Sequence, residues 1–364
     1  MKIAINTGGG DAPGLNAVIR AVVTAALQRG WSCHGIKEGY NGILEPERFP
    51  DGGVVPLSRA SVSGITHLGG TILGTTNKGS PLSYPVTRDD GSIITVDRCD
   101  EIINYLHNEN FDALIAIGGD GSLSIAHEIG RRGRFNVIGV PKTIDNDLKH
   151  TTATFGFDTA VTFATECIDR LHTTAESHNR IIVVEVMGRY AGWIALEAGV
   201  AGSADVILIP EIPYDLSRVA DKIRRRGETG AGFSIVVVAE GAHPKQGSRR
   251  VIQKEIGRAE RLGGIGNEIT RVLQRLTGQE ARCVVLGHLL RGGTPSAHDR
   301  LLALRFGAAA VRALEEGREH VMVALQPPYV KYVPLQDVAH AMKRVPLDGD
   351  TLATARDMGI SLGD

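Results

Sequence analysis

The chain has 364 residues, which predicts two or three domains at about 150 residues each and excludes a peptide hormone, a small disulfide scaffold or a lone binding module. Its 40 Lys and Arg residues and 41 Asp and Glu residues leave a net charge of -1, which excludes a general attraction to nucleic acid or to an anionic membrane. With 42% apolar and 22% charged residues, the composition excludes a disordered chain.

Short runs of β-branched residues alternate along the chain with stretches that have the apolar spacing of amphipathic helices. Nearly continuous apolar strands are typical of parallel sheets that helices cover on both faces. In chain order we expect strands at 2–6, 113–119, 136–141, 180–186, 205–211, 234–240 and 282–288, and helices at 15–28, 100–107, 159–172, 216–226 and 268–276. The alternation predicts an α/β architecture. We expect loops and short strands at 40–85, and a peripheral appendage from Val333 onward.

The numbers and positions of glycines and cysteines further narrow the class of protein. The 45 glycines exceed the roughly 25 expected at the usual frequency, and their clusters suggest backbone brought close to a ligand. The four cysteines form no CxxC pair, the first residues, MKIAINTGGG, contain no long apolar run, and no stretch approaches the ~18 residues needed to span a bilayer. We therefore expect a cytoplasmic protein without a structural disulfide, a bound zinc or a membrane span.

Polar or glycine-rich sequence follows five of the predicted strands directly. In open α/β sheets, ligands bind beyond the carboxyl ends of the strands. The five segments are TGGGDAPG, GGDGS, PKTIDND, MGR and GHLLRGG. Together they predict a single active-site cleft.

The first segment, TGGGDAPGLNAVIR (7–20), is a strand end followed by glycines and the start of a helix. Exposed backbone N–H groups and the positive end of a helix dipole can bind phosphate there. The segment is not a Walker motif, because no GK[ST] follows. A tight connection without a ligand remains an alternative.

The second segment, IAIGGDGSLSIAHEI (115–129), places the Asp120 carboxylate at a strand end beside glycines. Mg²⁺ takes one or two carboxylates and fills its other sites with phosphate oxygen and water. The pattern indicates phosphoryl transfer, although Asp120 could also serve only as a helix cap.

The third segment, GVPKTIDNDLKHT (139–151), carries two carboxylates, Asp145 and Asp147, just after Lys142 and Thr143. One carboxylate can accept a proton from an attacking hydroxyl while the other helps to hold metal, and Lys142 can neutralise the transferring phosphoryl group. A plain turn rich in Asp and Asn would have a similar composition.

Arginines and one histidine supply the remaining signals. Arginine binds phosphate bidentately, which suits an acceptor that already carries a phosphate, although any one of these residues could be a surface ion pair. Glu240, at the end of a predicted strand, could bind sugar hydroxyls or cap a turn. The twelve histidines show no zinc-ligand spacing. The candidates for phosphate binding are Arg180, Arg189, Arg282, His288 and Arg291.

From Lys2 to about Ala313 the chain resembles the phosphofructokinase family, which has TGGGDAPGLNAVIR, GGDGS, PKTIDND, EVMGRYAGW and GHLLRGGTPSAHDR in this order. The resemblance implies phosphoryl transfer to O1 of fructose 6-phosphate, giving fructose 1,6-bisphosphate in glycolysis. It implies two similar α/β domains, each a mostly parallel sheet flanked by helices, with the active site in the cleft between them. We expect residues 1–155 plus about 290–330 to bind the donor, and 156–289 plus the C-terminal segment to bind the sugar phosphate.

The resemblance also implies roles for individual residues. Asp145 matches the general base, Thr143 lies beside the transferred phosphoryl group, Lys142 and Arg189 assist catalysis, and Asp120 and Asp147 hold Mg²⁺. Donor contacts fall on Gly10, Tyr40, Asn77, Lys78, Gly119, Asp120, Gly121 and Ser122, and acceptor contacts on Thr143, Asp145, Met187, Gly188, Arg189, Glu240, His288 and Arg291. Arg180 and Arg282 match arginines that reach the sugar phosphate from a neighbouring subunit, which implies a homo-oligomer, a tetramer or a dimer.

Family members use either ATP or pyrophosphate as the donor. Pyrophosphate users usually have Asp where this chain has Gly121, and a carboxylate ~4 Å from the α-phosphate of ATP would cost roughly 4 kcal/mol. Lys142 is instead typical of pyrophosphate users, and Asn77 replaces a donor-binding arginine of ATP-dependent enzymes. This mixture is similar to the branch in which ATP and pyrophosphate users are interleaved, and we expect ATP because charge exclusion is harder to overcome than an additional lysine.

Three alternatives to this activity remain open. The enzyme could use pyrophosphate, or it could act on a related acceptor such as sedoheptulose 7-phosphate. From a different class, the chain could be a catalytically silent sensor of nucleotides or sugar phosphates. The carboxylates Asp120, Asp145 and Asp147 argue against a sensor, because a sensor needs no base.

Overall fold

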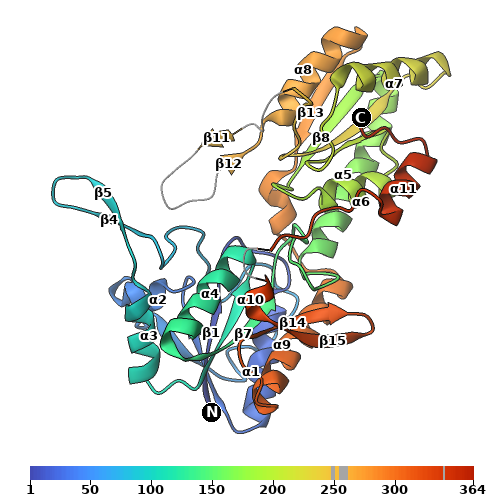
Figure 1. Ribbon diagram of the computed structural model, residues 1–364. Helices are drawn as coiled ribbons and strands as arrows, with labels where there is room; N and C mark the ends of the chain where they lie inside the picture. Colours follow the sequence, from blue (N-terminus) through green and yellow to red (C-terminus); the bar gives the residue numbers. More distant parts are fainter. Residues whose placement is uncertain (247–250, 254–260, 339–340) are drawn as a thin grey trace.

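The computed structural model describes residues 1–246, 251–253, 261–338 and 341–364. Figure 1 shows two bodies, each with a central sheet and helices packed on it, and the N- and C-termini lie in different bodies. Within the described residues, no helix combines the length and the apolar character that a membrane span requires.

The larger body contains a seven-stranded sheet in the order β15-β14-β7-β6-β1-β2-β3. Its five inner strands are parallel, and β3 and β15 pair antiparallel at the two edges. The strands are β1 Lys2–Thr7, β2 Ser32–Ile36, β3 Val54–Leu57, β6 Ala113–Gly118, β7 Asn136–Pro141, β14 Val321–Gln326 and β15 Tyr329–Pro334.

Helices cover both faces of this sheet because its inner strands are apolar on both sides. Ile3 and Ile5 point to the face covered by α1 (Leu15–Gln28) and α9 (Ala297–Glu315), whereas Ala4 points to the face covered by α3 (Cys99–Asn108), α4 (Asp120–Gly133) and α10 (Leu335–Val338). This alternation follows from the two-residue repeat of a strand.

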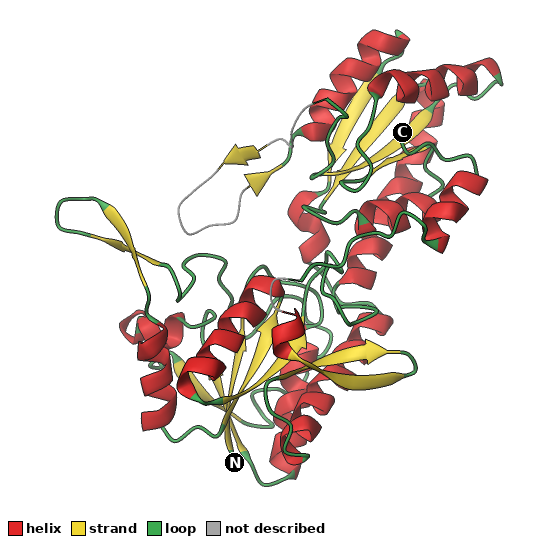
Figure 2. Cartoon of the chain, viewed as in Figure 1, coloured by secondary structure: helices red, strands yellow, loops and turns green. Residues whose placement is uncertain are grey.

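The smaller body has a four-stranded parallel sheet in the order β13-β8-β10-β9, also between helices (Figure 2). Its strands are β8 Ile181–Val186, β9 Val206–Leu208, β10 Ser234–Ala239 and β13 Ala281–Val285. One face packs against α5 (Phe157–His178), α6 (Trp193–Ala201) and α11 (Asp350–Asp357), and the other against α7 (Leu216–Glu228) and α8 (Ile265–Thr277). The expected fold class, two similar domains with mostly parallel sheets flanked by helices, is confirmed.

Short elements fill the segment from Tyr40 to Pro85, as expected. They are α2 (Asn41–Leu44), the 3₁₀ turn η1 (Pro46–Arg48), β3 and the start of the hairpin β4 (Tyr84–Thr87) and β5 (Ile93–Val96), which projects from the larger body. A second small pair, β11 (Val251–Gln253) and β12 (Arg261–Leu262), projects from the smaller body (Figure 1).

The expectation of a peripheral appendage from Val333 onward is wrong. Leu335 and Val338 are fully buried in the larger body, and Ser361 forms a parallel bridge with Val206 of the smaller sheet. Leu362 is 1% exposed. The segment therefore belongs to the cores of both bodies. Its described helices, α10 and α11, have only four and eight residues, so its buried residues show no long helical or strand period in the sequence.

Candidate active site

A cavity of about 980 Å³ lies where the two bodies meet. The strand ends of both sheets reach it: Gly9 follows β1, Gly119 follows β6 and Thr143 follows β7, while Val186 and Glu240 end or follow β8 and β10. Its lining includes Gly9, Gly10, Asp11, Asn77, Lys78, Gly119, Asp120, Gly121, Thr143, Asp145, Asp147, Glu185, Val186, Met187, Arg189, Tyr190, Glu240, Val285, His288, Arg291 and Met342.

The glycines after β1 allow charged side chains to approach the backbone closely. A Cβ on Gly10 would lie 2.8 Å from Nη1 of Arg291, and a Cβ on Gly8 would lie 2.7 Å from Oγ of Ser122. The Lys142 ammonium donates a short hydrogen bond to the Gly10 carbonyl, and Arg291 Nη1 donates to the Asp11 carbonyl at 3.1 Å. Two cations therefore hold the loop: Lys142, which follows β7, and Arg291 of η2 (Gly287–Arg291).

Asp120 is the first residue of α4, so its carboxylate stands where strand β6 turns into a helix. Gly121 follows on the same side of the cavity, and a Cβ built there would meet no atom within 4 Å. The space in front of Gly121 is open to a donor molecule.

The segment after β7 brings the pair of carboxylates to the floor of the cavity. Thr143 Oγ1 accepts a hydrogen bond from the Asp145 N–H at 3.1 Å, which tightens the turn. Among the described residues, Oδ1 of Asp145 is buried without a hydrogen-bond partner. Burial raises the pKa of Asp145, although Arg291, Arg189 and Lys142 oppose the shift. A carboxylate that faces a cavity with one oxygen free of hydrogen bonds and a raised pKa is the arrangement of a candidate general base.

Asp147 and Lys142 have shifted pKa values for related reasons. Burial, assisted by the charge of Asp145, raises the pKa of Asp147 to about 6, and the charge of Asp120 adds to this rise. Burial, assisted by the charge of Arg291, lowers the pKa of Lys142 to about 7. The carboxylates therefore repel one another, and a bound cation would relieve that repulsion.

Asp120 and Asp147 fit Mg²⁺ as hard oxygen ligands beside open space for phosphate. In the part of the chain that the structure describes, no group of three or more His, Cys, Asp or Glu residues could form a complete metal cage. This pattern suits Mg²⁺, which is commonly held by one or two carboxylates and otherwise by phosphate and water.

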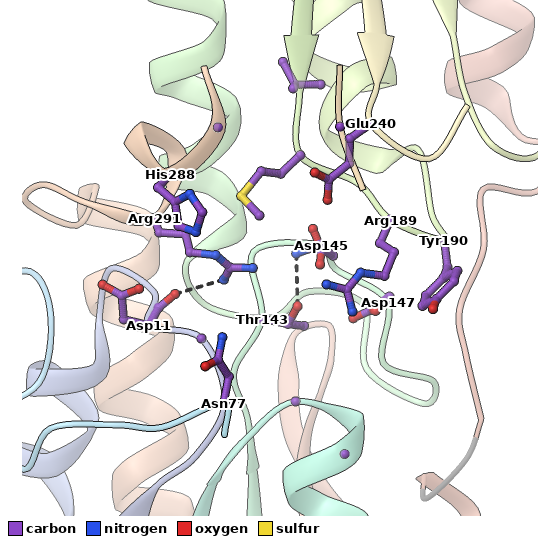
Figure 3. A pocket seen from close by; sticks show the side chains of 18 of the residues that line it. Asp11, Asn77, Thr143, Asp145, Asp147, Arg189, Tyr190, Glu240, His288 and Arg291 are labelled. Atoms are coloured by element: carbon purple, nitrogen blue, oxygen red, sulfur yellow. Dashed lines mark hydrogen bonds between the residues drawn. The ribbon is translucent and has the colours of Figure 1, made fainter. Parts of the chain in front are cut away.

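The opposite wall carries the arginines and Glu240 (Figure 3). Arg291 and Arg189 point toward Asp145 from opposite sides, and His288 lies beside Arg291. Arg189 also stacks over the ring of Tyr190, with its guanidinium 5.8 Å from the ring centre. Burial and the nearby Asp145 raise the pKa of Glu240 to about 7. Two guanidinium groups facing a carboxylate can hold a phosphorylated acceptor against a base.

Most residues predicted from the sequence meet in this one cavity, but some do not line it. Tyr40 is 7% exposed and packs into the core beside α3, and Ser122, Lys142 and Gly188 lie behind the cavity surface. Lys142 and Ser122 contact the glycine loop, residues 8–10, on its side away from the cavity. Tyr40 belongs to the same buried apolar cluster as residues of α3 and α4, so its predicted donor contact has no support in this geometry.

Arg180 and Arg282 lie at the opposite end of the smaller sheet from the cavity. Arg180 precedes β8, Arg282 is the second residue of β13, and both form ion pairs with Glu280. Neither arginine lines the cavity of its own chain.

Sequence reasoning missed several lining residues. Glu185 is 3% exposed and accepts hydrogen bonds from the N–H groups of Gly264 at 3.0 Å and Gly266 at 2.7 Å, so it ties β8 to the start of α8. The sequence could have identified Glu185, because a glutamate inside the apolar run IIVVEV is unusual. Met342 comes from the C-terminal segment, where no sequence signal pointed to the site.

Comparisons with known proteins agree with this geometry. The family model described as phosphofructokinase matches residues 2–314. ATP-dependent 6-phosphofructokinase 2 of Clostridium perfringens is 50% identical over 368 residues, covering 100% of this chain and 98% of that protein. Pyrophosphate–fructose 6-phosphate 1-phosphotransferase of Amycolatopsis mediterranei is 47% identical over 351 residues, covering 96% of this chain and 97% of that protein.

A solved structure shows the same fold. The crystal structure of Pichia pastoris phosphofructokinase is 32% identical and superposes with a TM-score of 0.78, covering 93% of this chain and 37% of the Pichia chain. The cleft, the ordered strand-end segments and the full-length identity lead to one assignment: this chain belongs to the phosphofructokinase family.

Proposed function

We propose that this chain is an ATP-dependent 6-phosphofructokinase, which transfers the terminal phosphoryl group of ATP to O1 of fructose 6-phosphate in glycolysis. The observation that carries the proposal is the Asp145 carboxylate between two cavity arginines, Arg189 and Arg291, with its Oδ1 atom buried and without a hydrogen-bond partner. The name of the Clostridium relative, which matches the whole chain, supports the same activity.

In this mechanism the acceptor lies between the two bodies with its phosphate held by arginines. Arg189, His288 and Arg291 bind and orient the sugar phosphate, and Glu240 accepts hydrogen bonds from its hydroxyls. Asp145 takes the proton of the 1-hydroxyl as its oxygen attacks the terminal phosphorus in line. Lys142 and Arg189 offset the negative charge that develops on the transferring group.

The donor is placed on the side of the larger body. The backbone N–H groups of Gly10, Gly119 and Gly121 are suited to bind its phosphates, and Asn77 and Lys78 line the same region. We assign Mg²⁺ to Asp120 and Asp147; when bound, it neutralises the polyphosphate and polarises the transferred group. Residues 1–155 with about 290–330 would form the donor-binding domain, and 156–289 with the C-terminal segment the acceptor-binding domain.

We further infer that the protein works in the cytoplasm as a homo-oligomer. All four cysteines are free, as expected in a reducing compartment. Arg180 and Arg282 would contribute to the sugar-phosphate site of a neighbouring subunit, because their position at the far end of β8 and β13 leaves them outside their own cavity.

Pyrophosphate is the second candidate donor, and a specific observation favours it. The buried Lys142 ammonium lies behind the glycine loop, 3.5 Å from where a Cβ of Gly9 would be, and adds positive charge where a short donor could bind. The Amycolatopsis relative is named as a pyrophosphate-dependent enzyme. We favour ATP because no carboxylate at position 121 blocks the space in front of the helix.

The deciding experiment supplies ATP or pyrophosphate in parallel with fructose 6-phosphate and Mg²⁺, and compares kcat/KM for each donor. Gly121→Asp and Gly121→Asn serve as a matched pair, since a side chain of either size fits the open space at this position. We expect ATP to be preferred, and Gly121→Asp to lose up to about a thousandfold in kcat/KM for ATP while Gly121→Asn loses far less.

Three results would contradict parts of the proposal. Faster turnover with pyrophosphate would reverse the donor assignment, and binding of fructose 6-phosphate without turnover on either donor would indicate a sensor. Faster turnover of sedoheptulose 7-phosphate than of fructose 6-phosphate would change the acceptor.

A further inference from the structure

A segment outside the region matched by the family model reaches the proposed catalytic carboxylates. We call residues 341–349 the C-terminal strap; the family model ends at residue 314. In Figure 1 the chain passes here from α10 on the larger body to α11 on the smaller one. Met342 lines the cavity and forms an antiparallel bridge with Leu148, and the Lys343 N–H donates to the Asp147 carbonyl at 2.7 Å.

The Lys343 ammonium fills the inside of the loop that carries the carboxylates. Its Nζ donates to Oδ1 of Asn146 at 2.9 Å, to the Thr151 carbonyl at 3.0 Å and to the Thr152 carbonyl at 2.9 Å. All three donor positions of an ammonium group are thus used on one loop. Without this group, these three oxygens would lose a charged donor, and a hydrogen bond from a charged group contributes more to stability than a neutral one.

The residue that Lys343 holds stands between the two carboxylates. Asn146 is 4% exposed and has a positive φ of 49°, a conformation that fixes the directions of Asp145 before it and Asp147 after it. Its Oδ1 also accepts from the Thr154 N–H at 3.2 Å. The Lys343 ammonium and the Thr154 N–H therefore both hold the Asn146 side chain in place by donating to its Oδ1.

The other side of the strap is fixed to the smaller body. The Trp193 indole N–H donates to the Lys343 carbonyl at 3.2 Å, and the ammonium lies 5.4 Å from the centre of the indole ring. Two residues further on, the Val345 N–H donates to Oε1 of Glu211 at 3.0 Å, and Glu211 also accepts from the Gly192 N–H at 3.1 Å. The strap thus links the carboxylate loop of one body to α6 of the other.

We propose that Lys343 is a positioning residue for the phosphoryl-transfer step. It holds Asp145 and Asp147 in the correct position relative to the groups that the smaller body supplies. This inference rests on the proposed function. The arginines that bind the acceptor lie on other elements, η2 and the turn after β8, so loss of the ammonium should leave acceptor binding nearly intact. Turnover should fall, because misplacing a reacting group by about 1 Å can cost about a hundredfold.

The test compares Lys343→Met with Arg344→Met in the full-length protein. Methionine keeps an unbranched chain against Trp193 but lacks the ammonium, and Arg344 is the adjacent, exposed cation of the same strap. We expect Lys343→Met to lower kcat by about 10- to 100-fold with KM for fructose 6-phosphate within about threefold of the parent. Arg344→Met should match the parent.

A second measurement separates positioning from folding. In Lys343→Ala, added ethylammonium chloride should restore part of kcat, whereas tetramethylammonium chloride at the same concentration, which cannot donate hydrogen bonds, should not. If Lys343→Met turns over at the parent rate, or loses affinity for the acceptor without losing kcat, the inference is overturned. A parent protein inactive on fructose 6-phosphate would instead contradict the proposed function.

Discussion

At the scale of one residue, Asp145 illustrates a conflict between activity and stability: turnover needs its carboxylate, but the folded protein is less stable with that charge in the cleft. Its carboxylate is buried without a hydrogen bond on Oδ1, and burial raises its pKa despite three nearby cations. We expect Asp145→Asn to lower kcat by about 10²–10⁴, the usual range for loss of a general base, with a smaller effect on KM. The same change should raise the Tm at pH 8, because burial disfavours this charge more than the three cations favour it, as the raised pKa indicates. Steady-state kinetics and thermal unfolding test both, and unchanged turnover would remove Asp145 from this role.

Glu240 allows a test of pH dependence that does not involve catalysis. Its pKa is raised from 4.5 to about 7, chiefly by burial, so the folded protein holds this proton more tightly than the unfolded chain. The stabilisation is complete below pH 4.5 and is lost as the pH rises through 7. Relative to the parent, Glu240→Gln should therefore raise the free energy of unfolding by up to about 2 kcal/mol more at pH 8.5 than at pH 5.5, because the parent keeps most of this stabilisation at pH 5.5 and has lost it at pH 8.5.

Unfolding free energies of parent and variant at the two pH values measure this effect. Glu47→Gln is the control, because Glu47 is exposed on η1 and far from the strand ends that carry Glu240. A Glu240→Gln effect that does not change between the two pH values would show that the raised pKa is absent in solution.

At the scale of elements, the burial of a strand determined whether it could be predicted from the sequence. All seven predicted strands are present, and six of them are apolar runs buried on both faces; β13 is the exception, with Arg282 and Val285 exposed. The predicted strand 205–211 is only Val206–Leu208, since only these three residues pair with β10. β2 and β15 were not predicted, because Ser, His and Gly interrupt the first and the second is a half-exposed edge strand. The apolar run VMVALQ of β14 was readable and was overlooked.

The same reasoning explains which parts of the site could be predicted. Asp120, Thr143, Asp145 and Glu240 follow strand ends, and parallel topology brings such ends together whatever their separation in sequence. Lys343 was not found, because it lies in an extended segment without periodicity and acts only through contacts with a distant loop. Its role depends on tertiary packing, which local patterns do not encode.

At the scale of the whole molecule, the position of Arg180 and Arg282 bears on whether neighbouring subunits contribute residues to one active site. Arg180 precedes β8, whose opposite end reaches the cavity, and the six residues of β8 span about 20 Å at about 3.3 Å each. An arginine side chain cannot cover that distance. Arg282 lies three residues before the lining residue Val285, about 10 Å along β13, and forms an ion pair with Glu280, away from the cavity. We therefore expect both arginines to bind the sugar phosphate of another subunit.

Subunit mixing tests this arrangement with two variants that are each defective. Asp145→Asn lacks the base, and Arg282→Ala lacks an exposed arginine whose side chain is 58% accessible, so its loss should not disturb folding. After exchange of subunits at a 1:1 ratio, about a quarter of the sites would combine an intact Asp145 with an intact Arg282 from the neighbour, and activity should recover toward that fraction. Mixing Asp145→Asn with Asp145→Ala should recover nothing. If native mass spectrometry shows hybrid oligomers but activity stays at the level of the separate variants, each site is complete within one chain.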